Sequence, residues 1–416
     1  MDGKEKVVLA YSGGLDTSVA ALWLQEQGYE VITFTADVGQ PVDLQRVRDK
    51  ALRVGVLEAY VFDLREEFVS GYVAPIIKAN GLYQGKYPLS ASISRPLISK
   101  YLVWLAKKEG AGYVAHGCTG KGQDQVRFDV SVAALDPTLK VLAPVRDWGM
   151  SREEEIDYAL QYGIPVDVTK SSPYSIDVNV WGRSIECGPL EDPWVEPPSD
   201  AFEWTVDPLE APDRPTYMEI EFEGGLPVAV DGERMSLLSI LELLNKVGGE
   251  NGVGRIDMIE DRLVGFKSRE VYEAPAAKII LEAHRAIESL TLSKELLAFK
   301  ASVEPRYAEL VYTGYWYSPL KQALDVFFDY TQQWVNGKAR VKLYKGSCTV
   351  VGLASETDSL YKHDLATYSK EDAFDHRAAA GFIKIWGLPI RTWAERHILE
   401  DAMYSEEKLS RFMLNV

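Results

Sequence analysis

Cysteine and histidine are scarce in this chain of 416 residues, and neither is clustered. The three cysteines, an odd number, stand far apart at Cys118, Cys187 and Cys348. No two of them form a CxxC pair, and the five histidines include no HExxH sequence. The spacing therefore indicates neither a disulfide framework nor a zinc site. It predicts a cytoplasmic protein whose thiols are reduced.

Two further features are missing: a long hydrophobic run and an excess of basic residues. The apolar stretch at 7–11 is followed too closely by Ser12, Asp16 and Gln25 for a signal peptide or a membrane span. The chain has 45 Lys and Arg against 62 Asp and Glu, a formal net charge of −17. Such a charge repels phosphate backbones and disfavours a nucleic acid partner. It does not exclude a nucleotide, because a small site uses local donors.

Length and pattern predict more than one domain. At roughly 150 residues per domain, a chain of 416 residues suggests two or three. Strand and helix patterns alternate in the first half, which predicts an α/β fold with a mainly parallel sheet and helices on both faces. We expect strands at 6–11, 30–36, 59–63, 113–117 and 140–143. We expect helices at 17–27, 44–54, 96–109 and, from a capping box that begins at Ser151, 151–163.

The pattern changes near Pro173, and the second half is predicted to be α+β. A proline-rich connection at 189–215 precedes antiparallel strands expected at 217–223, 228–230, 339–344 and 348–353. Helices are expected at 236–246, 274–290, 304–313 and 319–335. An amphipathic helix at 391–412 predicts docking on a partner subunit. We therefore place domain boundaries after residues 168 and 385, which divide the chain into 1–168, 169–385 and a helical tail at 386–416.

A glycine-rich turn, Ala-Tyr-Ser-Gly-Gly-Leu-Asp-Thr-Ser at 10–18, joins the first expected strand to the first expected helix. Its glycines let backbone N–H groups converge, and the helix N-terminus and the nearby hydroxyls add donors, which favours phosphate binding. The lysine of a Walker loop and the GxGxxG of a dinucleotide site are both absent. The alternative is a structural turn in which Asp16 caps the helix. The position after a parallel strand favours the phosphate site.

The segment 116–128, His-Gly-Cys-Thr-Gly-Lys-Gly-Gln-Asp-Gln-Val-Arg-Phe, is the second candidate. It follows the fourth expected strand, so its loop should face the same crevice as the first motif. Its glycines offer a backbone nest beside two cations, Lys121 and Arg127, and one carboxylate, Asp124. The alternative is a polar loop in which Asp124 caps a helix and Lys121 is solvated.

Both segments resemble known families. The first resembles the pyrophosphate loop of the N-type ATP pyrophosphatases, which split ATP between its α and β phosphates. The second closely resembles the hallmark segment of the argininosuccinate synthases. That resemblance continues in order along the chain, at Tyr87, Ser92, Arg95-Pro96, 173–177, Ser184, 186–188, 252–257, Glu260, 267–269 and Tyr272.

The resemblance implies a ligase that joins citrulline to aspartate through a citrullyl-adenylate, while ATP is split to AMP and pyrophosphate. It implies ATP contacts at Ala10, Tyr11, Ser12, Gly13, Gly14, Leu15, Asp16, Thr17, Ser18, Ala36 and Gly117. It implies citrulline contacts at Tyr87, Ser92, Gln123, Arg127, Ser175, Ser184, Glu260 and Tyr272. It implies aspartate contacts at Thr119, Gln123 and Asp124.

Three residues are expected to act in catalysis. Asp16 should stand near a magnesium ion that arrives with ATP, Arg95 should neutralise phosphate charge, and Asp124 should orient the incoming amine. Arg95 has a plainer interpretation as an exposed helix start before Pro96. The resemblance also implies a homotetramer. It implies that 1–168 is the nucleotide-binding domain of an ATP pyrophosphatase, that 169–385 is a synthetase and multimerisation domain, and that 386–416 is an oligomerisation helix. The alternative classes are a tRNA thiolase, which needs a basic surface and reactive cysteines, and an adenine-nucleotide sensor, which does not need the citrulline set.

One position departs from the family pattern, which usually has Asn where this chain has Gln123. The amide is kept, but the side chain is longer by one methylene. The amide is therefore either pushed into the junction of citrulline and aspartate or folded aside.

Overall fold

The computed structural model describes residues 4–150, 152–164 and 173–397. Its contacts divide the chain into two compact units, Met1–Leu360 and Tyr361–Val416. In the described residues, the three β-sheets all lie in the first unit. The domain boundaries expected after residues 168 and 385 stay predictions.

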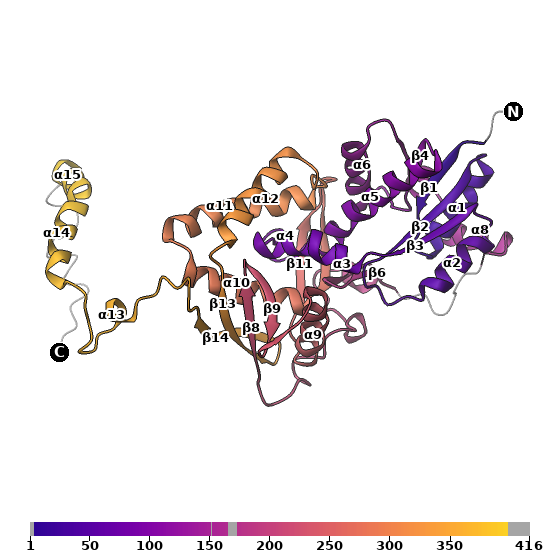
Figure 1. The fold of residues 1–416 in the computed structure, drawn as a ribbon. Coiled ribbons are helices and arrows are strands. Elements are labelled where there is room, and N and C mark those ends of the chain that lie inside the picture. The colour runs from indigo at the N-terminus through magenta and orange to yellow at the C-terminus, as the bar shows by residue number, and fades with distance from the viewer. Residues whose placement is uncertain (1–3, 151, 165–172, 398–416) are drawn as a thin grey trace, which may run out of the picture. The chain divides into compact units, whose positions relative to one another are not determined.

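The N-terminal sheet is parallel, with the strand order β3-β2-β1-β4-β5 (Figure 1). Its strands are β1 (Lys6–Ala10), β2 (Glu30–Asp37), β3 (Glu58–Asp63), β4 (Tyr113–Ala115) and β5 (Lys140–Leu142). Successive side chains of a strand point to opposite faces. On β1, Val7 packs in one core with helices α1 (Leu15–Glu26) and α2 (Leu44–Arg53), while Val8 packs in another with α5 (Ser90–Glu109). The predicted α/β fold with helices on both faces is confirmed.

The first half of the chain contains further helices. They are α3 (Arg65–Phe68), the π-helix η1 (Val69–Val73), α4 (Ala74–Lys78), α6 (Asp124–Leu135), α7 (Pro144–Asp147) and α8 (Arg152–Gln161). Helix α8 packs beside α1. Ser151, the expected start of a capping box, lies outside the described residues.

Two helices begin earlier than predicted, because their expected starts were placed at or next to a proline. Helix α5 contains Pro96 in its interior and starts after Leu89, whose left-handed φ is 66°. Helix α11 spans Lys294–Tyr312, ten residues longer at its start than expected, with Pro305 inside it. Its N-cap is Ser293, which accepts a hydrogen bond from a backbone N–H. Proline favours the first position of a helix, which predicts a start at Pro96. The residues before Pro96 are buried in the folded chain, and this packing extends α5 back to Ser90.

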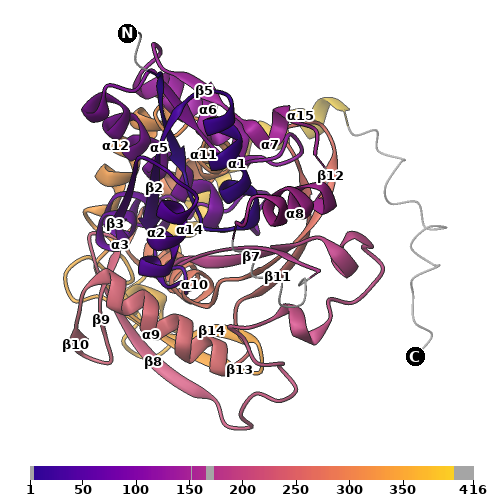
Figure 2. The same cartoon turned by 90° about the vertical axis from the view of Figure 1, so that its right-hand side faces the viewer.

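The second half contains the expected antiparallel sheet, ordered β10-β9-β8-β13-β14. Its strands are β8 (Thr216–Glu223), β9 (Leu226–Val230), β10 (Glu233–Arg234), β13 (Gly337–Tyr344) and β14 (Ser347–Ala354). The helices are α9 (Leu237–Glu250), α10 (Pro275–Thr291) and α12 (Pro319–Gln332), with α9 against β9 (Figure 2). Helix α9 runs past Gly248, the expected stop. A Cβ there would lie 2.8 Å from the Cβ of Pro275, so this glycine serves a close helix contact.

A four-stranded antiparallel sheet, ordered β11-β12-β7-β6, was not expected. Its strands are β6 (Ser175–Asn179), β7 (Gly182–Glu186), β11 (Arg255–Asp261) and β12 (Lys267–Glu273), and short 3-10 turns follow at η2 (Gly188–Glu191) and η3 (Ser199–Ala201). The β6–β7 turn anchors this sheet to the start of α5. The Asn179 side chain donates to the Ser90 carbonyl at 2.8 Å, and the Trp181 indole donates to the Pro88 carbonyl at 2.7 Å.

The second unit contains α13 (His363–Ala366), α14 (His376–Trp386) and α15 (Leu388–His397) (Figure 1). Helix α15 covers the start of the tail helix expected at 391–412, and residues 398–416 lie outside the described residues. Helices α14 and α15 bury none of their described residues within this chain. No described helix of the chain is both long enough and apolar enough to cross a membrane.

Candidate functional site

The loop between β1 and α1 is shaped by glycine and by short hydroxyl contacts. Gly13 has a φ of 79°, and a Cβ there would lie 3.0 Å from Val47. The Ser12 and Thr17 hydroxyls are 3.1 Å apart, and the Gly14 N–H donates to the Ser12 hydroxyl at 3.3 Å. Gly14 is the N-cap of α1, and no described side chain caps this helix. The alternative in which Asp16 caps the helix is therefore wrong, and the N–H groups of the first turn remain available as donors.

A cavity of about 590 Å³ opens beside this loop, within the range of ~300–1,000 Å³ typical of small-molecule sites. From the residues expected to contact ATP, it is lined by Ser12, Gly14, Leu15, Asp16, Thr17 and Gly117. The expected residues that do not line it are Ala10, Tyr11, Gly13, Ser18 and Ala36. Gly117 follows β4, and a Cβ there would lie 2.8 Å from the Thr17 methyl group. The loops after β1 and β4 therefore meet, as expected.

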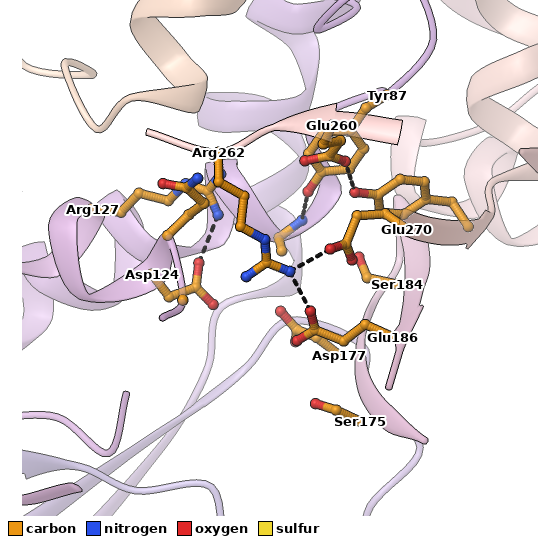
Figure 3. Close-up of a pocket in the computed structure, with 14 residues that line it drawn as sticks. Tyr87, Asp124, Arg127, Ser175, Asp177, Ser184, Glu186, Glu260, Arg262 and Glu270 are labelled. Carbon is orange, nitrogen blue, oxygen red and sulfur yellow. Dashed lines mark hydrogen bonds and ion pairs between the residues drawn. The ribbon is translucent and has the colours of Figure 1, made fainter. Parts of the chain in front are cut away.

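A smaller cavity of about 100 Å³ lies next to the first, because Ser175 lines both (Figure 3). From the residues expected to contact citrulline, it is lined by Tyr87, Gln123, Arg127, Ser175, Ser184, Glu260 and Tyr272. Its other lining residues are Ala91, Gly122, Asp124, Asp177, Glu186, Arg262 and Glu270. Ser92 is the one expected citrulline residue that does not line it, and its side chain is buried in α5.

The period of a β-strand explains much of this cavity wall. On β7, Ser184 and Glu186 are two residues apart, and on β12 Glu270 and Tyr272 are two apart, so each pair shares one face. Tyr272 and Ser184 are directly paired in the sheet register. The unexpected four-stranded sheet therefore turns one polar face toward the cavity.

Asp124 is held between two arginines. Its Oδ2 accepts from Arg95 Nη2 and its Oδ1 from Arg127 Nη1, each at 2.7 Å. Arg95 also pairs with Asp177. Burial raises the pKa of Asp124, but attraction to Arg95 and Arg127 outweighs it and lowers the pKa to about 2. Asp124 is therefore ionised and held in position by the two arginines. It does not cap α6, because the N-cap of that helix is Gln123.

Arg95 is neither an exposed helix start nor a wall of the larger cavity. It lies inside α5 with little exposure, and burial, which lowers its pKa, is outweighed by Asp124 and Asp177, which raise it. The exposed-start interpretation is wrong. Thr119, expected to contact aspartate, is exposed and lines neither cavity.

Glu260 presents a carboxylate that is held by two tyrosines. Tyr272 donates its hydroxyl to Oε1, and Tyr312 donates to Oε2 at 2.8 Å. The rings of Tyr87 and Tyr272 stack with their centroids 4.3 Å apart. Burial raises the pKa of Glu260, while the hydroxyls of Tyr272 and Tyr312 and the charge of Arg127 oppose that rise. The result is a rigid acceptor on an otherwise aromatic wall.

The side-chain amide of Gln123 has no partner among the described residues. The residue is 7% exposed, lines the smaller cavity, and neither Nε2 nor Oε1 has a hydrogen bond to any described residue. Buried amides in proteins are normally paired. The amide is therefore suited to a ligand that both donates and accepts.

Sequence reasoning missed two charged residues of the cavity, Arg262 and Glu270. Asp177 and Glu186 were part of the family resemblance but had no role. Arg262 stands two residues after Glu260, and Glu270 stands two before Tyr272. This period of two would have identified both residues if the strands had been recognised.

Comparisons with known proteins bear on the fold and the family. The model of the arginosuccinate synthase N-terminal HUP domain matches residues 6–165, and that of the arginosuccinate synthase C-terminal domain matches 174–393. The fold and its two adjoining cavities thus define a HUP-domain protein with a C-terminal α+β region. The argininosuccinate synthase of Rubrobacter xylanophilus is 60% identical over 95% of this chain and 96% of its own. That of Symbiobacterium thermophilum is 57% identical over 94% of this chain and 98% of its own. The chain belongs to the argininosuccinate synthase family.

Proposed function

We propose that this chain joins citrulline to aspartate with the energy of ATP, forming argininosuccinate, AMP and pyrophosphate. The observation that carries the proposal is the buried, unpaired amide of Gln123 in the smaller cavity. Such an amide matches amino acid ligands, which carry both donors and acceptors. All residues expected to contact citrulline, except Ser92, line the same cavity, which supports the assignment.

ATP is assigned to the larger cavity. The uncapped N-terminus of α1 and the hydroxyls of Ser12 and Thr17 supply donors for its phosphates. Ala36, at the carboxyl end of β2, borders the adenosine in this proposal. Because Ser175 lines both cavities, the α-phosphate of ATP and the ureido group of citrulline meet near this residue.

The reaction proceeds in two steps in this proposal. The ureido oxygen of citrulline attacks the α-phosphorus, forming a citrullyl-adenylate and releasing pyrophosphate. The aspartate amine then attacks the ureido carbon and displaces AMP. A ureido oxygen is a weak nucleophile, so the rate depends on positioning and charge stabilisation. The paired arginines Arg95 and Arg127 hold Asp124 ionised, which lets it orient the incoming amine but makes it a poor proton acceptor.

Magnesium is proposed to enter with ATP. Asp16 lines the larger cavity and is the one acidic residue of the 10–18 turn. One carboxylate fits Mg²⁺, which keeps several waters and takes phosphate oxygens as its other ligands. The ion, when bound, would neutralise charge on the phosphates.

We also propose a homotetramer, in which the second unit contacts other subunits. The support is a set of exposed, large apolar side chains on α14 and α15: Phe382, Ile383, Ile385, Trp386, Leu388, Ile390 and Trp393. A cytoplasmic location is part of the proposal and rests on the sparse cysteines of the sequence.

The proposed reaction is tested by following AMP and pyrophosphate with citrulline and aspartate each omitted in turn. We expect AMP release to require both amino acids. Labelled pyrophosphate should exchange into ATP with citrulline alone, because the adenylate forms first. ADP and phosphate as products would contradict the assignment.

A further inference from the structure

Arg262 is shared by two carboxylates that line the smaller cavity (Figure 3). Its Nη2 donates to Glu186 and to Glu270. Its Nε donates to the Ser268 hydroxyl at 2.6 Å, and that hydroxyl donates to Glu270 at 2.8 Å. All three charged residues line the cavity and none has a role in the reaction proposed above.

Arg262, Glu186 and Glu270 form a cluster with two carboxylates and one guanidinium. Glu270, on β12, faces Glu186 on β7, Glu260 on β11 and Arg262 just after β11. Its side chain is only 7% exposed, against 36% for Glu186. Burial and the charge of Glu186 raise the pKa of Glu270 to about 8, although Arg262 opposes this. Two carboxylates that share one guanidinium in a nearly buried site favour a proton on Glu270, the less exposed of the two, in the free protein.

The amino end of citrulline is expected at this side of the cavity. Its ureido group must reach ATP, and Ser175 is the residue that lines both cavities. Figure 3 places Ser175 and Glu260 on opposite sides of the cavity, with Glu270 on the Glu260 side. The α-ammonium group therefore brings a second cation close to the carboxylates.

We propose that Glu270 is a positioning residue that loses its proton when the α-ammonium group of citrulline enters the cavity. The O–H bond of the carboxylic acid breaks and the proton passes to solvent, and no other bond changes. Ionised Glu270 then keeps Arg262 in place through their ion pair. This inference rests on the proposed function, because it takes citrulline as the ligand.

Calorimetric titration of citrulline into the full-length protein tests this coupling. The protein is saturated with an ATP analogue whose α–β bridge is a methylene, and buffers with different ionisation enthalpies report the protons released. With a pKa of about 8 for Glu270, we expect about one proton per citrulline near pH 7 and about a quarter near pH 8.5. The citrulline Kd should be about eightfold larger at the lower pH, because the proton must first be displaced.

The variant Glu270→Gln keeps the shape of the side chain and cannot ionise. We expect it to release no proton and to show a citrulline Kd that does not change with pH. The control Asp261→Asn removes a carboxylate from the same β11–β12 hairpin, one that pairs with Lys267 and lines neither cavity. It should release protons as the unaltered protein does.

The outcomes separate the inference from the function. Citrulline binding without proton release, or undiminished release from Glu270→Gln, would overturn the role of Glu270 and leave the proposed function intact. A complete absence of citrulline binding to the unaltered protein would overturn the function itself. The proton count of the unaltered protein at the two pH values decides the coupling even if Glu270→Gln fails to fold.

Discussion

Replacing Gln123 with methionine should stabilise the free protein against unfolding and raise the KM for citrulline or aspartate. Methionine has nearly the shape of glutamine but carries no amide. In the structure that amide is buried and makes no hydrogen bond to a described residue. Its desolvation is therefore an uncompensated cost of folding, which the substitution removes.

The expected size follows from that cost. An unsatisfied buried polar group costs ~1–3 kcal/mol, so Gln123→Met should raise the free energy of unfolding by about that amount. The same amide would lose its bonds to substrate, each worth ~1.5–3 kcal/mol where the partner is charged. We therefore expect the KM for citrulline or aspartate to rise ~10- to 100-fold. The assays are thermal unfolding without ligands and steady-state argininosuccinate formation.

Gln125 provides a matched control two residues along the same chain segment. It is 8% exposed, but its Nε2 donates to the carbonyls of Gly120 and Gly122 at 2.5 and 3.3 Å. Gln125→Met removes a satisfied amide and should lower stability by ~1 kcal/mol. If Gln123→Met lowers the unfolding temperature as Gln125→Met does, the amide of Gln123 is bonded within the free protein and the reasoning is refuted.

Three further predictions concern the same machinery. Gln123→Asn should weaken citrulline or aspartate affinity, because the shorter side chain leaves a gap; higher turnover with unchanged Michaelis constants would contradict this. Asp16→Ala should abolish pyrophosphate exchange, whereas Asp124→Asn should retain part of the exchange and stop argininosuccinate formation; equal losses in both partial reactions would show that the roles are misassigned. Truncation before Pro389 should lower the native mass seen by light scattering, since α15 is exposed; an unchanged mass would exclude a role in assembly.

Local sequence determined the parallel sheet and the phosphate loop. The strands of that sheet are short, mostly apolar runs separated by segments with helical spacing, and each signal lies within about ten neighbouring residues. The glycines at 13 and 14 occur where a strand turns directly into a helix, so the turn could be recognised from neighbouring residues alone. The family also followed from motif order, which is a property of the chain alone.

Tertiary structure decided where α5 begins and which polar residues meet. The first turn of α5 precedes Pro96 and is buried by packing that sequence position does not reveal. The sheet beside the cavity pairs β7 with β12 and so joins β6 and β7 to β11 and β12. These segments are about 80 residues apart in the sequence. Whether the Gln123 amide is paired, and whether Glu270 shares Arg262 with Glu186, depends on these distances in space. Side-chain pairing and desolvation are properties of neighbours in the folded chain, so no local pattern encodes them.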